Sequence, residues 1–250
     1  MKAGRLQMLV SVRTLDEALL VAESGAAGGA DFIDLKEPRD GALGGLPPAT
    51  VLAIVAALRA KGCGLPVSAT IGDLPMHALP TILARVAALY DSGVDYIKVG
   101  IEAAPGPAAA AGGAVLDALA TVHTAPGVAV VPVFMADAGL DLGLLEHALA
   151  RNFGVCMVDT ADKQRGSLFD VAPVDTLHRF VQAARAAGAR VGLAGALRLQ
   201  HLPLLAELAP DFVGFRSAVC RGDRRAALDP LLLRDLSARL HAAETAALRV

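Results

Sequence analysis

Eight short runs of β-forming residues alternate with longer Ala- and Leu-rich stretches along the 250 residues, and this order constrains the fold more than any other feature. Strands that alternate with helices form parallel sheets. We expect strands at 7–12, 31–37, 66–72, 95–100, 128–137, 154–160, 190–195 and 212–218, with a last helix over 230–248. With no linker in the composition, these units predict one domain over residues 1–250, an α/β fold of the (β/α)₈ TIM-barrel type. A doubly wound open sheet is the alternative.

An internal repeat strengthens the barrel prediction. The even-numbered strands align as GADFIDLK (29–36), GVDYIKVG (93–100), GVCMVDTA (154–161) and APDFVGFRS (209–217). Side chains alternate faces along a strand, and alternate strands of a barrel supply the same interior layer. We therefore expect an apolar layer of Phe32, Tyr96, Met157 and Phe212. The next layer holds Asp34, Lys98, Asp159 and Gly214, and Lys36 and Arg216 stand at the lip.

Lysine is rare in this chain, with five residues against 18 arginines, and Lys36, Lys98 and Lys163 fall at or just beyond predicted strand ends. An amine can lose its proton and attack a carbonyl, whereas a guanidinium stays protonated. The pattern favours lysine chemistry in the barrel mouth. Buried structural Lys–Asp pairs are the alternative for Lys36 and Lys98, and a solvated loop charge is the alternative for Lys163. The sequence does not settle which lysine is neutral, although depth in the barrel favours Lys98.

A phosphate site is expected in the loops after the seventh and eighth strands, where barrels often bind phosphate. These loops read AGALR (194–198) and GFRSAVCRGDRR (214–225). Small residues let backbone N–H groups approach an anion, and side chains add further donors. The predicted phosphate-binding residues are Gly195, Ala196, Gly214, Arg216 and Ser217. Arg221, Arg224 and Arg225 are interpreted as a solvated helix start.

Composition excludes several classes of function. A net charge of -2 offers no basic surface for nucleic acid. Mean hydropathy is +0.52, but the longest apolar run, 128–136, is interrupted by Pro132 and is too short to cross a membrane. The apolar run at 8–12 is too short for a signal-peptide core, so we expect a cytoplasmic protein. Three cysteines without CxxC spacing and six scattered histidines predict no disulfide framework, no metal site and no cofactor.

Six segments of the chain resemble one family, the (5-formylfuran-3-yl)methyl phosphate synthases, also called 4-(hydroxymethyl)-2-furancarboxaldehyde-phosphate synthases. The segments are IDLKEPRDGALG (33–44), VSATIGDLP (67–75), DYIKVG (95–100), MVDTADKQRGSLFD (157–170), LAGALR (193–198) and VGFRSAVCRGDR (213–224). The resemblance implies a lyase that condenses two molecules of glyceraldehyde 3-phosphate into a furan aldehyde phosphate for methanofuran-type one-carbon carriers. It also implies that Lys36 forms a Schiff base and Lys98 accepts a proton, supported by Asp34, Asp159 and Lys163.

Two other functions stay open at this point. A class I aldolase or a triose-phosphate-type isomerase would need the same lysines and phosphate site. A non-catalytic phosphosugar-binding barrel would use the lysines only as partners of Asp34 and Asp159. In each case the partner is a small phosphorylated molecule. The sequence fixes neither the oligomeric state, for which a homo-oligomer stays open, nor the order of chemical steps.

Overall fold

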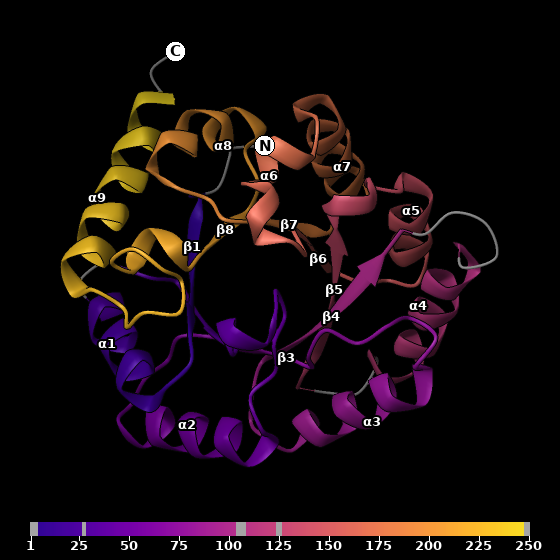
Figure 1. Cartoon of the computed structure of the whole chain (residues 1–250), viewed down its shortest axis with the longest axis horizontal. Helices are drawn as coiled ribbons and strands as arrows, with labels where there is room; N and C mark the ends of the chain where they lie inside the picture. The colour runs from indigo at the N-terminus through magenta and orange to yellow at the C-terminus, as the bar shows by residue number, and fades with distance from the viewer. Residues whose placement is uncertain (1–4, 27–28, 104–108, 124–126, 248–250) are drawn as a thin grey trace.

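The fold is a closed eight-stranded parallel barrel in the computed structural model, which describes residues 5–26, 29–103, 109–123 and 127–247. Each strand pairs in parallel with the next, and β1 closes the ring by pairing with β8 (Figure 1). The strands are β1 Gln7–Val12, β2 Phe32–Leu35, β3 Val67–Thr70, β4 Tyr96–Glu102, β5 Ala129–Met135, β6 Val155–Asp159, β7 Arg190–Leu193 and β8 Phe212–Phe215. The predicted TIM barrel is confirmed, and the open-sheet alternative is wrong.

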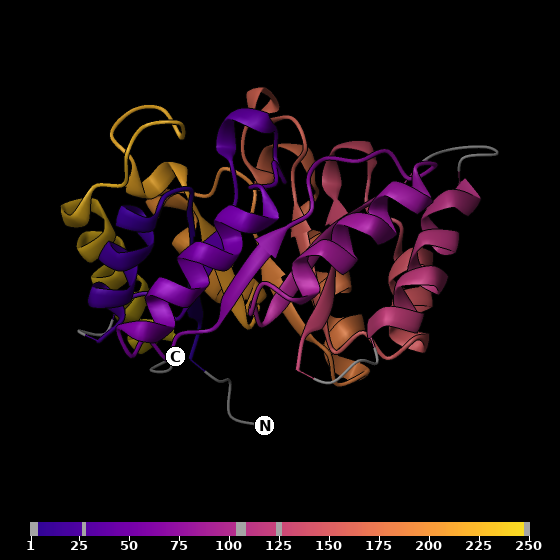
Figure 2. The same ribbon diagram turned by 90° about the horizontal axis from the view of Figure 1, so that it is seen from below.

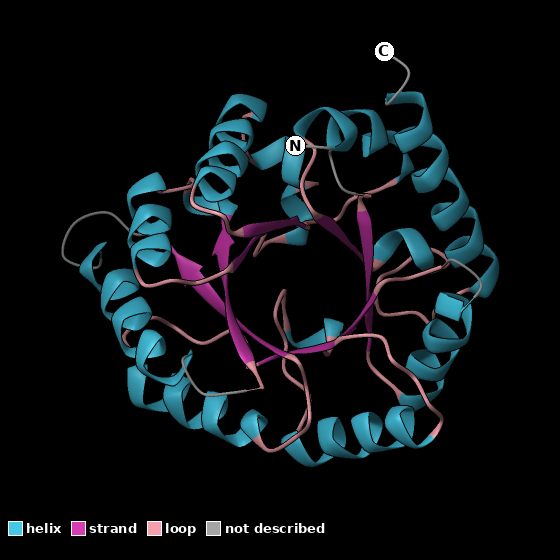
Figure 3. Cartoon of the chain, turned by 180° about the vertical axis from the view of Figure 1, so that it is seen from behind, coloured by secondary structure: helices cyan, strands magenta, loops and turns pink. Residues whose placement is uncertain are grey.

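Helices surround the barrel on its outer side (Figures 1 and 3). They are α1 Leu15–Ala26, α2 Pro48–Ala60, α3 Leu79–Tyr90, α4 Ala109–His123, α5 Leu142–Ala150, α6 Leu168–Val171, α7 Val174–Ala186, α8 Leu202–Leu208 and α9 Pro230–Ala247. Short 3₁₀ helices follow several strands: η1 Pro38–Asp40, η3 Ala136–Ala138, η4 Lys163–Arg165, η5 Leu199–His201 and η6 Ser217–Val219. The last helix was expected to reach residue 248, which lies outside the described residues.

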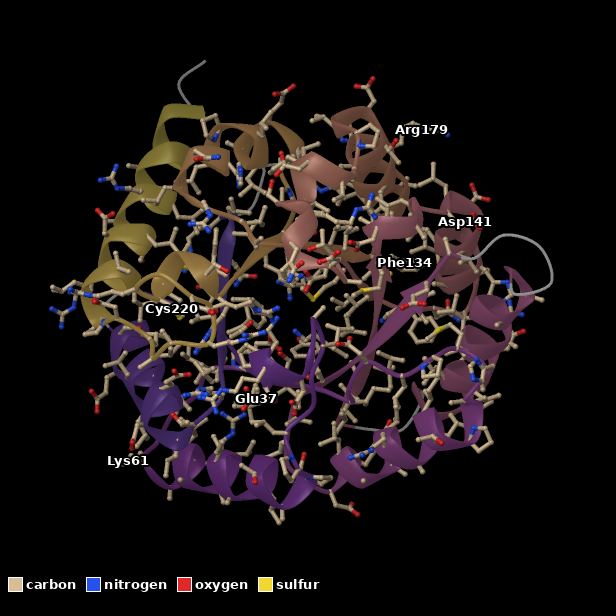
Figure 4. The ribbon with its side chains drawn as sticks, viewed as in Figure 1. Glu37, Lys61, Phe134, Asp141, Arg179 and Cys220 are labelled. Atoms are coloured by element: carbon tan, nitrogen blue, oxygen red, sulfur yellow. The ribbon has the colours of Figure 1, made fainter. Side chains whose placement is uncertain are left out.

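The helices cover the barrel because each buries one apolar stripe. In α7 the buried residues are Leu177, Phe180, Val181 and Ala184, at the three- and four-residue spacing of one helix face. Phe180 packs edge-on against Phe134 of β5, with ring centroids 5.3 Å apart. Arg179 and Asp141 lie toward the outer edge of the molecule, whereas Phe134 lies between the strands and the helices (Figure 4). Among the described residues, no helix has the length and apolarity that a membrane crossing needs.

The lower part of the barrel interior is filled by the predicted apolar layer. Phe32, Tyr96, Met157 and Phe212 belong to one interior cluster, with 5.5 Å between the ring centroids of Phe32 and Phe212. The guanidinium of Arg190 lies over both of these rings, at 5.6 and 5.7 Å from their centroids. Two of the cysteines, Cys156 and Cys220, are buried as expected for packing residues. The floor beneath the charged layer is therefore apolar and largely aromatic.

The upper part of the interior is shaped by the loop after β2, residues 37–46. Ala42 and Leu43 of this loop are buried and join the interior cluster. The Leu43 N–H donates to Asp73 Oδ1 at 3.0 Å, and Gly41 supplies a positive φ of 108°. In Figure 2 this loop and the loop between β8 and α9 project from the same end of the barrel. The chain thus folds two loops over the carboxyl ends of the strands.

Candidate active site

One pocket at the carboxyl ends of the strands is lined by all ten predicted site residues. It has about 410 Å³ of space free of protein atoms, its mouth included. The lining residues predicted from sequence are Asp34, Lys36, Lys98, Asp159, Lys163, Gly195, Ala196, Gly214, Arg216 and Ser217. Lys36 and Lys98 thus face the same space, as the alternation of side chains along the strands predicts.

Asp34 is the most deeply buried charged group of the pocket. Its carboxylate accepts hydrogen bonds from Ser11 Oγ at 2.8 Å and Ser68 Oγ at 2.7 Å, and it forms an ion pair with the Lys98 amine. Burial opposes ionisation, but the charges of Lys98 and Lys36 outweigh it and lower the pKa of Asp34. Asp34 is therefore a carboxylate that holds the Lys98 amine in place.

Asp159 makes a second pair at the end of β6. Lys163 Nζ donates to Asp159 Oδ1 at 2.5 Å and to Thr160 Oγ1 at 2.9 Å, and also to the Thr160 carbonyl oxygen. Burial raises the pKa of Asp159, but the charges of Lys163 and Lys36 outweigh this and lower it. The suggestion that Lys163 is only a solvated loop charge is wrong, because its side chain is 16% exposed and turned into the pocket.

Lys36 differs from the other two lysines because no described carboxylate lies within ion-pair distance of its amine. Its Nζ donates to the Ala42 carbonyl oxygen at 3.3 Å, and the residue is 6% exposed. Burial lowers the pKa of Lys36 to about 8; Asp159 and Asp34 raise it, while Lys98 and Lys163 lower it further. A lysine with this pKa is about one-tenth neutral at pH 7. The amine at the mouth of the pocket is thus partly neutral near pH 7.

Depth in the barrel does not by itself decide which lysine is prepared for nucleophilic attack. Lys98 is the deeper of the two and also lines a second cavity beneath the site, among Phe32, Tyr96 and Phe212. Its amine, however, is engaged by the Asp34 carboxylate. The sequence-based argument that depth favours a neutral Lys98 left out this partner. Burial lowers the pKa of Lys36, which stands at the lip.

Small residues after β7 and in β8 form the opposite wall of the pocket. Gly195 has a φ of 117°, and a Cβ there would lie 2.9 Å from Thr160 Cγ2. Ala196 follows with a φ of 46°, in the left-handed region. Gly214 and Ser217 line the same side. This wall lets backbone groups approach a ligand closely.

Arg216 is committed to the protein rather than to the pocket. Its Nη atoms donate to Glu17 Oε2 at 2.7 Å and Oε1 at 3.1 Å, and to the carbonyl oxygens of Ser11 and Ala226 at 3.0 and 2.7 Å. Its Nε donates to the Arg224 carbonyl oxygen at 2.8 Å. All five N–H donors are thereby used, so the geometry does not agree with the expectation that Arg216 donates to a phosphate. The residue instead anchors the loop between β8 and α9 to α1 and β1.

Sequence reasoning missed several residues of the site. Ser11 and Ser68 hold Asp34, and their signal was a hydroxyl residue on the interior face of a mostly apolar strand. Arg224 was assigned to a solvated helix start, but it is half-buried and lines the pocket, while Arg221 and Arg225 are exposed. The helix begins only at Pro230. Among the described residues there is no cluster of three or more His, Cys, Asp or Glu side chains arranged to hold a metal.

A closed parallel barrel with buried lysines and carboxylates gathered at the carboxyl ends of its strands defines a (β/α)₈-barrel enzyme. The family model described as 4-HFC-P synthase matches residues 8–237. The chain belongs to this family, which confirms the resemblance found in its sequence.

Curated relatives agree with this membership. A protein of Methylorubrum extorquens is 39% identical over 229 residues, which cover 91% of this chain and 88% of that protein. A (5-formylfuran-3-yl)methyl phosphate synthase of Methanocaldococcus jannaschii is 36% identical over 223 residues, covering 87% of this chain and 92% of its own. A synthase of the same name from Archaeoglobus fulgidus is 34% identical over 241 residues, which cover 94% of this chain and 100% of that protein. The similarity therefore extends over nearly the whole of each protein.

Solved structures agree on the fold. A 3-hexulose-6-phosphate synthase from Salmonella typhimurium superposes with a TM-score of 0.62 at 18% identity, covering 95% of this chain and 100% of that one. A phosphoribosyl anthranilate isomerase from Thermus thermophilus superposes with a TM-score of 0.61 at 18% identity, covering 95% of this chain and 99% of that one. At this level of identity the likeness shows the barrel and nothing of the reaction.

Proposed function

We propose that this enzyme condenses two molecules of glyceraldehyde 3-phosphate to (5-formylfuran-3-yl)methyl phosphate, with loss of one phosphate and two waters, through a Schiff base on Lys36. The product would supply the furan of methanofuran-type carriers. The observation that carries the proposal is the Lys36 amine, which is buried at the pocket mouth with its pKa lowered to about 8 and has no bonded carboxylate. The names of the relatives supply the product.

The chemistry follows from what an imine does to its neighbouring carbon. The neutral Lys36 amine adds to the aldehyde carbon, and water leaves as the C=N bond forms. The protonated imine withdraws electrons, so a base can remove the proton from the adjacent carbon and leave a nucleophilic enamine. That carbon then attacks the carbonyl of the second triose. The later loss of phosphate and the closure of the furan ring require further proton transfers within the same pocket.

The two ion pairs supply groups for these transfers. Lys98 lines the same pocket as Lys36, and we assign it the role of proton acceptor that the family resemblance implies, with Asp34 holding its side chain in place. Asp159 ends β6, across the barrel from β2, and Lys163 lies in η4 just after it; this pair can return protons to leaving oxygens. The small-residue wall of Gly195, Ala196 and Gly214 offers backbone donors to a phosphate. The enzyme is then a carbon–oxygen lyase that needs no cofactor.

The first test is chemical trapping. Borohydride added with glyceraldehyde 3-phosphate should reduce the imine, and peptide mass mapping should place the adduct on the peptide that contains Lys36. Lys36→Arg should abolish the adduct, because a guanidinium cannot form the imine although it keeps the charge. Lys61→Arg, on the exposed end of α2, is the matched control. Lys98→Ala should still form the adduct while turnover falls about 10²–10⁴-fold, the usual loss for a general base.

The outcomes separate the competing functions. Formation of the furan, followed by its near-ultraviolet absorbance and its mass, distinguishes the synthase from an aldolase or an isomerase. An adduct on Lys98 would exchange the two lysine roles and leave the reaction class standing. Furan formation with no adduct on any lysine would rule out the imine. Tight binding of triose phosphate without turnover would favour a non-catalytic barrel.

A further inference from the structure

The pocket holds five cationic side chains, and three of them are neutralised by carboxylates. Lys98 pairs with Asp34, Lys163 with Asp159 and Arg216 with Glu17. The other two are Lys36 and Arg224, and neither forms an ion pair with any residue in the described part of the chain. Lys36 is the candidate nucleophile, so Arg224 is left as a permanent cation in the pocket wall without an assigned role.

Arg224 lies beside the candidate nucleophile, although 188 positions separate the two in sequence. Its Nη2 donates to the Gly41 carbonyl oxygen at 3.2 Å, and the carbonyl of the next residue, Ala42, accepts from Lys36 Nζ at 3.3 Å. Two consecutive carbonyls of one loop therefore receive the guanidinium and the amine. The loop between β8 and α9 brings Arg224 there, and Figure 2 shows both loops at the same end of the barrel.

The surroundings of Arg224 favour an anionic ligand. The residue is half-buried, and burial lowers its pKa, although a guanidinium remains protonated at any physiological pH. Asp159 and Asp73 act on this charge from a distance, but no carboxylate among the described residues pairs with it directly, so an incoming anion would recover part of the cost of its burial. A guanidinium also matches two oxygens of a phosphate at once, which a lysine amine cannot do.

We propose that Arg224 binds the phosphate of the triose that is attached to Lys36, while the small-residue wall after β7 and in β8 receives the phosphate of the second triose. The proposal rests on the proposed function for the identity of the substrate. Two phosphorylated molecules in one pocket need two anion sites, and Arg216 has no free N–H group for either. Arg224 is the side chain that fills this need next to the reactive amine.

The experiment compares a substrate that carries the phosphate with one that lacks it. Borohydride trapping at Lys36 is measured with glyceraldehyde 3-phosphate and with glyceraldehyde, in the wild type, Arg224→Gln, Arg224→Lys and Arg225→Gln. Arg225 is exposed on the same loop and serves as the matched control. Arg224→Gln should slow trapping of the phosphorylated triose about 10- to 100-fold, the loss expected for a charge-assisted contact, and leave glyceraldehyde unchanged. Arg224→Lys should recover part of the loss, and Arg225→Gln should behave as the wild type.

A loss of equal size for both substrates would overturn the proposal, since it would mean that Arg224 only holds the loop at Gly41. An unchanged rate with glyceraldehyde 3-phosphate would overturn it as well. Calorimetric titration with inorganic phosphate separates this proposal from the proposed function. If the wild type forms no imine but Arg224→Gln weakens phosphate binding, the anion site stands and the imine does not. If phosphate binds equally well to both proteins, Arg224 is not the site.

Discussion

Lys36 shows how a single residue ties reactivity to stability. The same burial that would free its amine for the proposed attack makes its protonated form costly to keep in the folded protein. Asp34 and Asp159 reduce that cost without removing it, because neither bonds to the amine directly. Functional sites commonly carry such local penalties, so removal of the group should stabilise the fold at the expense of activity.

We expect Lys36→Met to raise the free energy of unfolding at pH 7 by on the order of 3 kcal/mol, from a pKa near 8 in the folded protein and 10.5 in the unfolded chain. Between these two values the unfolded chain binds a proton that folded Lys36 does not. Wild-type stability therefore rises with pH in this window, and the advantage of the variant disappears above it. Urea unfolding from pH 7 to 11 measures this.

Lys61→Met is the control for that experiment, because Lys61 lies exposed at the periphery of the ring (Figure 4). It should change stability by less than about 0.5 kcal/mol at every pH. If Lys36→Met were less stable than the wild type at pH 7, the argument from burial would be wrong, and the amine would be contributing to the fold rather than straining it.

At the scale of elements, a buried ion pair connects α1 to the loop after β8. Glu17 accepts from Arg216 through both oxygens, and also from the backbone N–H groups of Arg13 and Leu228. Burial opposes ionisation of Glu17, but Arg216 and these backbone donors lower its pKa. The pair fixes the start of the loop that carries Ser217 and Arg224 over the pocket. Glu17 thus holds one wall of the pocket in position although it does not line the pocket itself.

Glu17→Ala should lower the free energy of unfolding by about 3–5 kcal/mol, because it leaves the Arg216 charge buried and unpaired. Glu17→Ala/Arg216→Ala should lose less than the two single variants added together. Since the folded pKa of Glu17 is depressed, its contribution is present above the unfolded value near 4.5 and is lost as pH falls below it. Denaturant unfolding at pH 7 and pH 4 tests both points.

The exposed pair of Asp235 and Arg239 on α9 provides the comparison. Asp235→Ala should cost less than about 1 kcal/mol, as exposed pairs do. If Glu17→Ala and Asp235→Ala lowered the free energy of unfolding by the same amount, the buried pair would not anchor the loop.

At the scale of the whole molecule, closure of the barrel depends on small residues that face large aromatic ones in its apolar layer. Gly192 of β7 pairs in register with Phe212 of β8, and a Cβ on Gly192 would lie 2.1 Å from the Phe212 ring. That ring is held by Phe32 and by the Arg190 guanidinium, so it has little room to move. The missing side chain at residue 192 is therefore what lets the aromatic layer close.

Gly192→Ala should destabilise the protein by about 1–3 kcal/mol, the usual cost of overpacking a core. Gly154→Ala is the matched control at the start of the neighbouring strand, because no atom lies within 4 Å of the added methyl group. It should be neutral or slightly stabilising. Thermal unfolding of the two variants measures the difference, and a Gly192→Ala protein as stable as Gly154→Ala would contradict this account of the floor.

Much of this architecture was predictable from the sequence alone, for a physical reason. Strand–helix alternation leads to a parallel sheet, and the two-residue period of a strand fixes which side chains share a face. These two rules place Phe32 and Phe212 in the floor and bring Lys36, Lys98 and Asp159 to one mouth. Both rules act within a segment or between repeated segments, so a pattern of residue types is enough to reveal them.

Only the tertiary structure decided how the charged groups are paired. Arg216 was expected to bind phosphate, but its donors are used by Glu17 and by loop carbonyls, whereas Arg224 was expected in solvent and lies in the pocket. Lys98 has a bonded carboxylate and Lys36 has none. The sequence determined the barrel and the set of residues at its mouth. The contacts between distant segments, which follow no local period, decided which lysine is paired with a carboxylate and which arginine of the pocket has no ion pair among the described residues.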